Sequence, residues 1–197
     1  MGPGAHSVKA STAGIALLAV VALVAVPSCS KKISTFVHPT ADFSLIERVA
    51  VLPFENLTGD GTAAEKVRQI VIIELLSSGS VQVVDVGEVA RGLRASSIGN
   101  TAMPSREDTR KLGQELQVQA LLGGSVQEYS AGRGAGASTN VSLVFRLIET
   151  DSGEVIWSSS ASKTGVGAMA RLFGVGGDSP GERARKLIRK ALKTLIS

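Results

Sequence analysis

The sequence predicts an α/β fold of the α+β type, in which a mixed sheet is flanked by helices and the chain ends in a hairpin and an amphipathic helix. Short apolar runs alternate with helical patterns in the first half, two strands of period two flank a tight turn in the second half, and the last segment has the apolar spacing of a surface helix. The chain has 197 residues, of which 44% are hydrophobic and 19% charged, a composition typical of a globular protein with one domain of ordinary size.

A strand–helix–strand unit opens the predicted domain. The apolar run Arg48–Phe54 predicts a strand buried on both faces, which should fade at Pro53 because proline cannot donate a hydrogen bond to a sheet. Thr62 and Glu65 have the spacing of a capping box and predict that a helix begins there. Gly79 predicts its end, as a left-handed cap, and a second short apolar run follows directly.

Three elements connect this unit to the second half of the chain. A short helical pattern covers 87–95, and a loop rich in turn residues follows it. Ser105 and Asp108 then predict the capped start of a helix that runs to about Leu116. The next strand is Ala120–Val126, whose two glycines permit a close backbone approach or a bulge.

A hairpin and a helix complete the pattern. Asn140–Glu149 alternates apolar and polar residues, Thr150–Glu154 is a tight turn signal with Gly153 at the positive-φ position, and the return strand follows. The final helix, Pro180–Ile196, has apolar residues at i, i+3, i+4 and i+7. Six cations are predicted to fill its opposite face: Arg183, Arg185, Lys186, Arg189, Lys190 and Lys193.

The N-terminus has the features of a secretory signal. Ala13–Val26 carries no charge, and it ends in Val26-Pro27-Ser28-Cys29, which resembles the bacterial lipobox that precedes an acylated cysteine. We therefore expect a signal peptide at 1–28, lipidation of Cys29, an acylated tether at 29–47 and a single domain at 48–197. The serine after the cysteine is compatible with sorting to the outer membrane, on its periplasmic face. A plain anchor helix with an incidental cysteine is the alternative.

The amino-acid sequence gives little indication of a catalytic site or of a nucleic-acid-binding surface. The only histidines, His6 and His38, lie outside the predicted domain, so neither a histidine-assisted nucleophile nor a histidine–cysteine metal site is expected there, and no cofactor is predicted. A net charge of +4 with one tryptophan and one tyrosine does not indicate a nucleic-acid surface. Carboxylates near predicted strand ends could serve a hydrolase but are more often helix caps: Glu55, Asp60, Asp85 and Glu88.

Three surfaces remain open as binding sites. The loop Glu55–Gly61 precedes a helix N-terminus, where a nucleotide phosphate could bind, although it lacks the order of the known phosphate-binding motifs. The glycine-rich segment Gly165–Gly177 carries Met169, Leu172 and Phe173, which could contact a membrane or a partner. The basic face of the last helix could meet anionic lipids.

Three stretches, in this order, resemble the CsgG/HfaB-like family of bacterial outer-membrane lipoproteins: Arg48–Gly59, Val118–Val126 and Val141–Thr164. The resemblance implies the fold of the TolB amino-terminal domain and a wider group that also includes penicillin-binding-protein activators of the LpoB type. Pore-forming members need two long membrane hairpins, and neither Tyr129–Thr139 nor Ser158–Gly177 supplies a complete one.

The resemblance implies a non-enzymatic envelope lipoprotein that is anchored in the membrane through Cys29 and acts through envelope proteins. The first expectation is a curli-secretion-like accessory in the export or assembly of surface structures, with a homo-oligomer as one expected state. The second is an LpoB-like activator of a peptidoglycan synthase. The third is a periplasmic domain that binds a small ligand or nucleotide.

Overall fold

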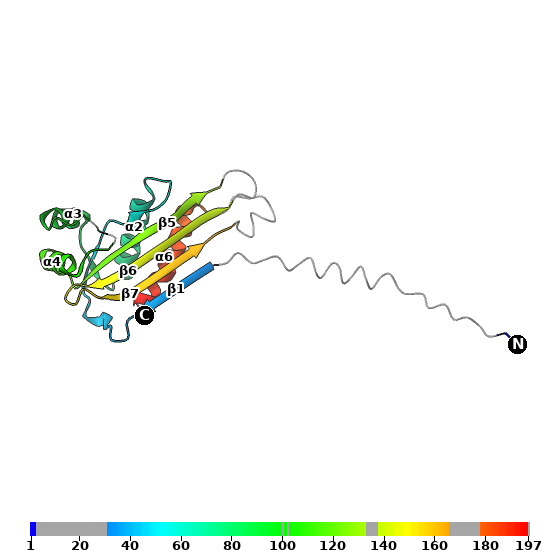
Figure 1. Cartoon of the computed structure of the whole chain (residues 1–197), viewed down its shortest axis with the longest axis horizontal. Coiled ribbons are helices and arrows are strands. Elements are labelled where there is room, and N and C mark those ends of the chain that lie inside the picture. Colours follow the sequence, from blue (N-terminus) through cyan, green and yellow to red (C-terminus); the bar gives the residue numbers. More distant parts are fainter. Residues whose placement is uncertain (3–30, 100, 102, 133–137, 166–177, 197) are drawn as a thin grey trace.

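The computed structural model describes residues 1–2, 31–99, 101, 103–132, 138–165 and 178–196, and it shows a twisted mixed sheet with helices along it (Figure 1). The strands are β1 (Lys31–Val37), β2 (Arg48–Val51), β3 (Glu55–Asn56), β4 (Gln82–Val83), β5 (Ala120–Ala131), β6 (Thr139–Glu149) and β7 (Val155–Lys163). The helices are the short 3-10 helix η1 (Phe43–Leu45), α2 (Ala63–Ser78), α3 (Val86–Ala95), α4 (Arg106–Leu116) and α6 (Pro180–Ile196).

The sheet is mixed, which confirms the predicted fold class. Its strand order is β1-β7-β6-β5-β2-β4, and β3 pairs with β5 beside β2. β2 runs parallel to β4 and β5, whereas β5, β6, β7 and β1 are antiparallel neighbours. The predicted hairpin joins β6 to β7, and Gly153 has φ +69° at its turn as expected.

The first strand–helix unit follows the prediction except at the start of the helix. β2 ends at Val51, before the proline, and Gly79 closes α2 with φ +66°. The capping box is wrong. Thr62 has a helical backbone (φ −102°, ψ −3°) and makes no side-chain cap, because Asp60 accepts hydrogen bonds from both its amide and its hydroxyl. Glu65 instead accepts a hydrogen bond from Gln69.

The tether predicted at 29–47 is wrong for the residues that the structure describes. Lys31–Val37 forms the edge strand β1, which pairs with β7 along its whole length. Ile33 packs against the main core, and Ile46 is buried after η1. The sequence did not indicate this strand because polar residues occur on both of its faces, Ser34 on one and Thr35 on the other, so β1 shows neither an apolar run nor a regular alternation.

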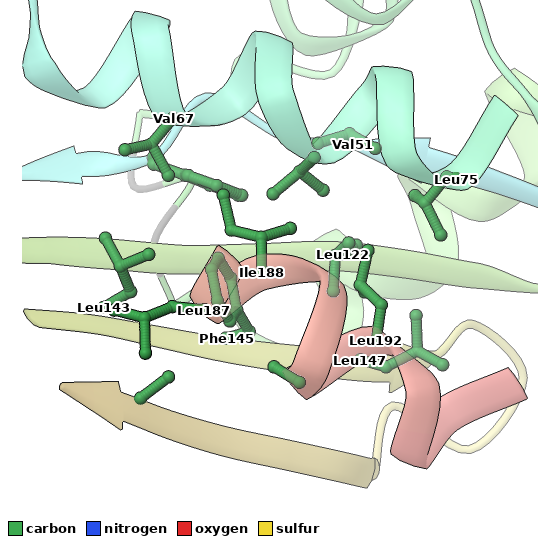
Figure 2. Packing of buried hydrophobic residues seen from close by; sticks show 14 of the residues in the cluster. Val51, Val67, Leu75, Leu122, Leu143, Phe145, Leu147, Leu187, Ile188 and Leu192 are labelled. Carbon is green, nitrogen blue, oxygen red and sulfur yellow. The ribbon is translucent and has the colours of Figure 1, made fainter. Parts of the chain in front are cut away.

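A large hydrophobic core lies between the sheet and helices α2 and α6. Figure 2 shows Val67 and Leu75 of α2 and Leu187 and Ile188 of α6 directed toward strand residues such as Phe145. A smaller cluster on the opposite side of the sheet joins α3 and α4 to β2 and the first residues of β5. The two helices of this second layer gather at one end of the molecule (Figure 1), so they cover only part of their face.

β5 and β6 approach each other unusually closely. A Cβ at Gly124 would lie 2.1 Å from the backbone oxygen of Val144, which confirms the predicted close approach of a glycine-bearing strand. A bulge follows between Val126 and Glu128, and β5 then continues to Ala131, beyond the predicted strand. β5 and β6 therefore form the long central ladder of the sheet.

Candidate functional site

Some predicted site residues lie outside the described residues. Cys29, the predicted lipidation site, is one of them, as are Met169, Leu172 and Phe173 of the glycine-rich segment. In the described ranges no three His, Cys, Asp or Glu side chains gather where they could hold a metal ion. No described helix combines the length and the apolar character that crossing a membrane requires.

The candidate carboxylates make local structural contacts. Asp85 caps α3 by accepting from the amides of Gly87 (2.8 Å) and Glu88 (3.3 Å). The carboxylate of Glu88 pairs with Arg48 at 3.0 Å, and Glu55 is exposed on β3. These contacts fit caps and surface ion pairs, and they do not bring two carboxylates together as an acid–base pair.

The loop before α2 is closed on itself by hydrogen bonds. The Asn56 side-chain oxygen accepts from Thr58, and its amide group donates to the backbone oxygen of Asp60 at 2.8 Å. Asp60 Oδ1 accepts from the Thr62 amide at 2.9 Å, and Oδ2 accepts from Lys66 at 3.1 Å. The Thr62 bonds, with help from Lys66, lower the pKa of Asp60 to about 2. A carboxylate therefore occupies the place that a nucleotide phosphate would need.

The cations predicted on the basic face of α6 are not all exposed and unpaired. One arginine is buried, and several other cations form ion pairs. Arg183 was expected on the exposed face, but it is only 1% exposed. Its Nη1 donates to the backbone oxygens of Thr139 and Gly165. The first turn of α6 passes over the ends of β6 and β7, so a residue that a helical projection places outward points into the protein there.

Other cations of α6 bind acidic groups of the same chain. Arg189 forms two hydrogen bonds with Glu74 of α2, at 2.9 and 3.1 Å, and Arg185 lies 3.9 Å from the same carboxylate. Lys186 donates to Asp178 at 2.6 Å, which is the main cause of the lowered pKa of Asp178. These ion pairs tie α6 to its neighbours and reduce the charge available for anionic lipids.

A pocket of about 310 Å³ opens between η1 and the C-terminal ends of α2 and α6. Its lining is mainly apolar and includes Phe43, Ile46, Leu75, Val81 and Leu195. The only polar side chains in this lining are two serines, Ser44 and Ser80. Such a lining offers no acid, base or cation, so the pocket is not a candidate for chemistry.

The part of the sheet that α3 and α4 leave uncovered is the best candidate site. β5, β6, β7 and β1 bury one set of side chains against α2 and α6, so alternation places the other set on the uncovered side. We call this surface the open face. It consists of Lys32, Ser34, Phe36, Ser125, Glu128, Ser142, Val144, Arg146, Ser158, Ser160 and Ser162.

Arg146 is the central feature of the open face. The strand register places it in one row with Gly123, Ser158 and Phe36. Its side chain is half-buried, and within the described residues it takes part in no hydrogen bond or ion pair. Phe36 lies at the edge of the row with 49% of its surface exposed. A serine-rich sheet surface with an exposed ring and a guanidinium that has no partner among the described residues can bind a protein partner.

The open face could be predicted only in part from the sequence. The alternation of β6 already places Ser142 and Arg146 on one face. It could not show that no described helix covers this face, because that depends on where α3 and α4 pack. β1 was also not recognised as a strand, so Phe36 was not connected with Arg146.

Comparison with known proteins identifies the family. A family model described as "Peptidoglycan-synthase activator LpoB" matches residues 31–162. Among solved structures, PelC of Paraburkholderia phytofirmans, a dodecamer, is similar with a TM-score of 0.59 and 19% identity, over 85% of this chain and 99% of that chain. The lipoprotein GNA1162 of Neisseria meningitidis has a TM-score of 0.50 and 25% identity, over 60% of this chain and 82% of that chain. The search of curated proteins finds no match.

These comparisons decide between the expected families. The PelC structure is below 25% identical, so its likeness concerns the fold alone. The comparisons do not support the resemblance to CsgG/HfaB-like lipoproteins, and the family match supports the LpoB-type alternative in its place. Because the match covers two thirds of the sequence, from the start of β1 to Ser162 of β7, the chain belongs to the LpoB family of peptidoglycan-synthase activators.

Proposed function

We propose that this protein is a non-enzymatic activator of a peptidoglycan synthase and that it binds the synthase through its open face. The observation that carries the proposal is the extent of the family match. It begins at the first residue of β1 and ends at Ser162 of β7, so it includes the strands of the open face together with α2, α3 and α4, and it excludes α6. The export role expected from the CsgG/HfaB resemblance is not retained.

Arg146 is the charged anchor of this proposal. Its guanidinium is not committed to a carboxylate of the described residues, so it can form a bidentate pair with a carboxylate of the synthase. Its row neighbours Gly123 and Ser158 are small and allow a partner surface to approach the strands. Arginine and aromatic residues are enriched among the few residues that dominate binding energy, and Phe36 supplies the ring.

Anchoring at the outer membrane, on its periplasmic face, is part of the same proposal. Cys29 is the last residue of the lipobox-like sequence and lies two residues before the start of β1. Its acylation would therefore attach the chain to the membrane close to the first strand of the domain. Several acyl chains on one residue give stable attachment, whereas one chain binds only marginally. Cys29→Ala should move the protein from the membrane fraction to the soluble fraction. Retention of the variant in the membrane would contradict acylation at this residue.

The central experiment measures glycan polymerisation by the purified synthase of the same bacterium, with and without this protein. Arg146→Glu should weaken binding by about 30-fold or more, because a dominant interface residue contributes about 2 kcal/mol and the reversed charge repels the partner carboxylate. Lys190→Glu is the matched control, since Lys190 is exposed on α6, on the opposite side of the sheet.

The two variants separate a site-specific effect from a general charge effect. Activation that is lost with Arg146→Glu and kept with Lys190→Glu supports the open face. Equal losses in both variants would indicate non-specific attraction, and full activation by Arg146→Glu would refute the assignment of the face. Thermal unfolding of both variants checks that each remains folded.

A further inference from the structure

The outer edge of β1 is a long unpaired strand edge. β1 is the terminal strand of the sheet, and all seven of its residues pair with β7 without a register shift. It contains no proline or bulge, its two lysines (Lys31 and Lys32) both lie at its N-terminal end, and no other described segment hydrogen-bonds to its outer side. Natural proteins usually interrupt such edges, because an unpaired edge is a template for another strand. An uninterrupted edge therefore indicates a binding surface.

The hydrogen-bond pattern shows which backbone groups face outward. The amide of His38 donates to Ile156 of the β7 side at 2.9 Å. Bonding direction alternates along an antiparallel strand, so Ser34 and Phe36 also direct their backbone groups toward β7. The amides and carbonyls of Ile33 and Thr35 are then directed outward and are available to a new strand.

We propose that a second copy of this chain pairs with β1, antiparallel and centred on Ser34, so that the two sheets become continuous. In this register Lys32 of each copy lies opposite Phe36 of the other, on the open face. An ammonium group over an aromatic ring is attractive, and Phe36 is 49% exposed in the single chain. Ile33 lies opposite Thr35 and exchanges the outward backbone hydrogen bonds.

The sequence of β1 favours antiparallel pairing centred on Ser34 over the other possible pairings of two β1 strands. Parallel pairing would place the lysines of both copies at the same end, where like charges repel, whereas antiparallel pairing separates them. A shift by one residue would pair side chains of opposite faces. A shift by two residues would leave the strand ends unpaired. Pairing centred on Ser34 uses the full strand and places both open faces on the same side.

Cysteine cross-linking tests the register directly. Ser34 lies opposite itself as a non-hydrogen-bonded pair, for which the Cα atoms are about 4.5 Å apart, within the range that a disulfide spans. Ser34→Cys in a Cys29→Ser background should therefore form a covalent dimer on mild oxidation of the full chain in mild detergent. Ser160→Cys is the matched control, because Ser160 is exposed on the same face and is the β7 partner of Ser34.

A proline variant tests the backbone pairing. Thr35→Pro removes an outward amide and leaves the bonds between β1 and β7 in place, since edge strands accept proline at such positions. It should reduce the cross-linking rate of Ser34→Cys by about tenfold. Because the contact is symmetric, the substitution removes one backbone hydrogen bond from each copy, so two are lost in every dimer. An unchanged unfolding temperature would show that β1 itself remains in the sheet.

The outcomes are distinct from those of the synthase assay, because no synthase is present. Rapid Ser34→Cys cross-linking that Thr35→Pro suppresses, with slow cross-linking of Ser160→Cys, supports the dimer. Equal cross-linking of the two cysteine variants would overturn it, as would insensitivity to Thr35→Pro. A disulfide between Ser34→Cys and a different protein in cells, with no dimer, would also overturn it and assign the edge to another partner.

Discussion

Gly124→Ala should destabilise the fold strongly, because the new methyl group has no space. Its Cβ would lie 2.1 Å from the carbonyl oxygen of Val144, which is about 0.9 Å inside the 3.0 Å limit that Cβ contacts observe. The obstacle is backbone in the central β5–β6 ladder, so it cannot move away as a flexible side chain would. Relief requires the strands to separate and to lose hydrogen bonds on both sides of the contact.

The expected loss of unfolding free energy in Gly124→Ala has three contributions. Overpacking costs about 1–3 kcal/mol, and two weakened ladder bonds cost about 1 kcal/mol each. Replacing glycine stabilises by about 0.4–1 kcal/mol through the unfolded state. The net loss is about 3 kcal/mol, from a total of about 5–15 kcal/mol for a typical domain. It corresponds to a fall of about 6–12 °C in Tm.

Urea unfolding followed by circular dichroism measures this loss, and Gly61→Ala supplies the control. A Cβ at Gly61 meets nothing within 4 Å, and its backbone has no positive φ. That variant should be neutral or slightly more stable. If Gly124→Ala unfolds at the same urea concentration as Gly61→Ala, the close approach of β5 and β6 is not a constraint on the fold, and the reasoning is refuted.

Two further predictions concern α4 and the start of α2. Gly113→Ala should cost about 1–3 kcal/mol in urea unfolding, because its Cβ would lie 2.4 Å from Thr150 Cβ where α4 meets the hairpin; a value near zero would contradict that packing. Asp60 has a folded pKa lowered from 3.8 to about 2, mainly by its hydrogen bonds with Thr62, so its stabilising contribution is complete above about pH 4 and is lost as pH falls toward 2. Asp60→Asn should flatten this part of the pH–stability profile, and an unchanged slope would show that the carboxylate is not responsible.

Local signals were sufficient for much of the fold. The alternation of β6, the turn at Gly153 and the apolar stripe of α6 each depend on residues close in sequence, and each was found where it was predicted. The strand ending before Pro53 and the cap at Gly79 also follow from the backbone restrictions of single residues.

The remaining features depend on contacts that sequence patterns do not encode. Arg183 lies on the polar side of a helical projection, yet its position over the ends of β6 and β7 buries it. Thr62 has the spacing of a capping residue, but Asp60 competes for its hydroxyl and amide. β1 becomes a strand only because β7 offers a partner far away in the sequence. Long-range competition decides each of these cases.

The composition of the open face leaves it available for binding without lowering the stability of the fold. On a sheet side that no described helix covers, large apolar residues would be exposed and would favour aggregation. Here most of its strand positions carry serine, which exposes little apolar area. The core on the other side supplies the apolar burial, so this face contributes little to folding and remains available to a partner. Arg146, a long side chain without a partner among the described residues, is therefore better explained by recognition than by packing.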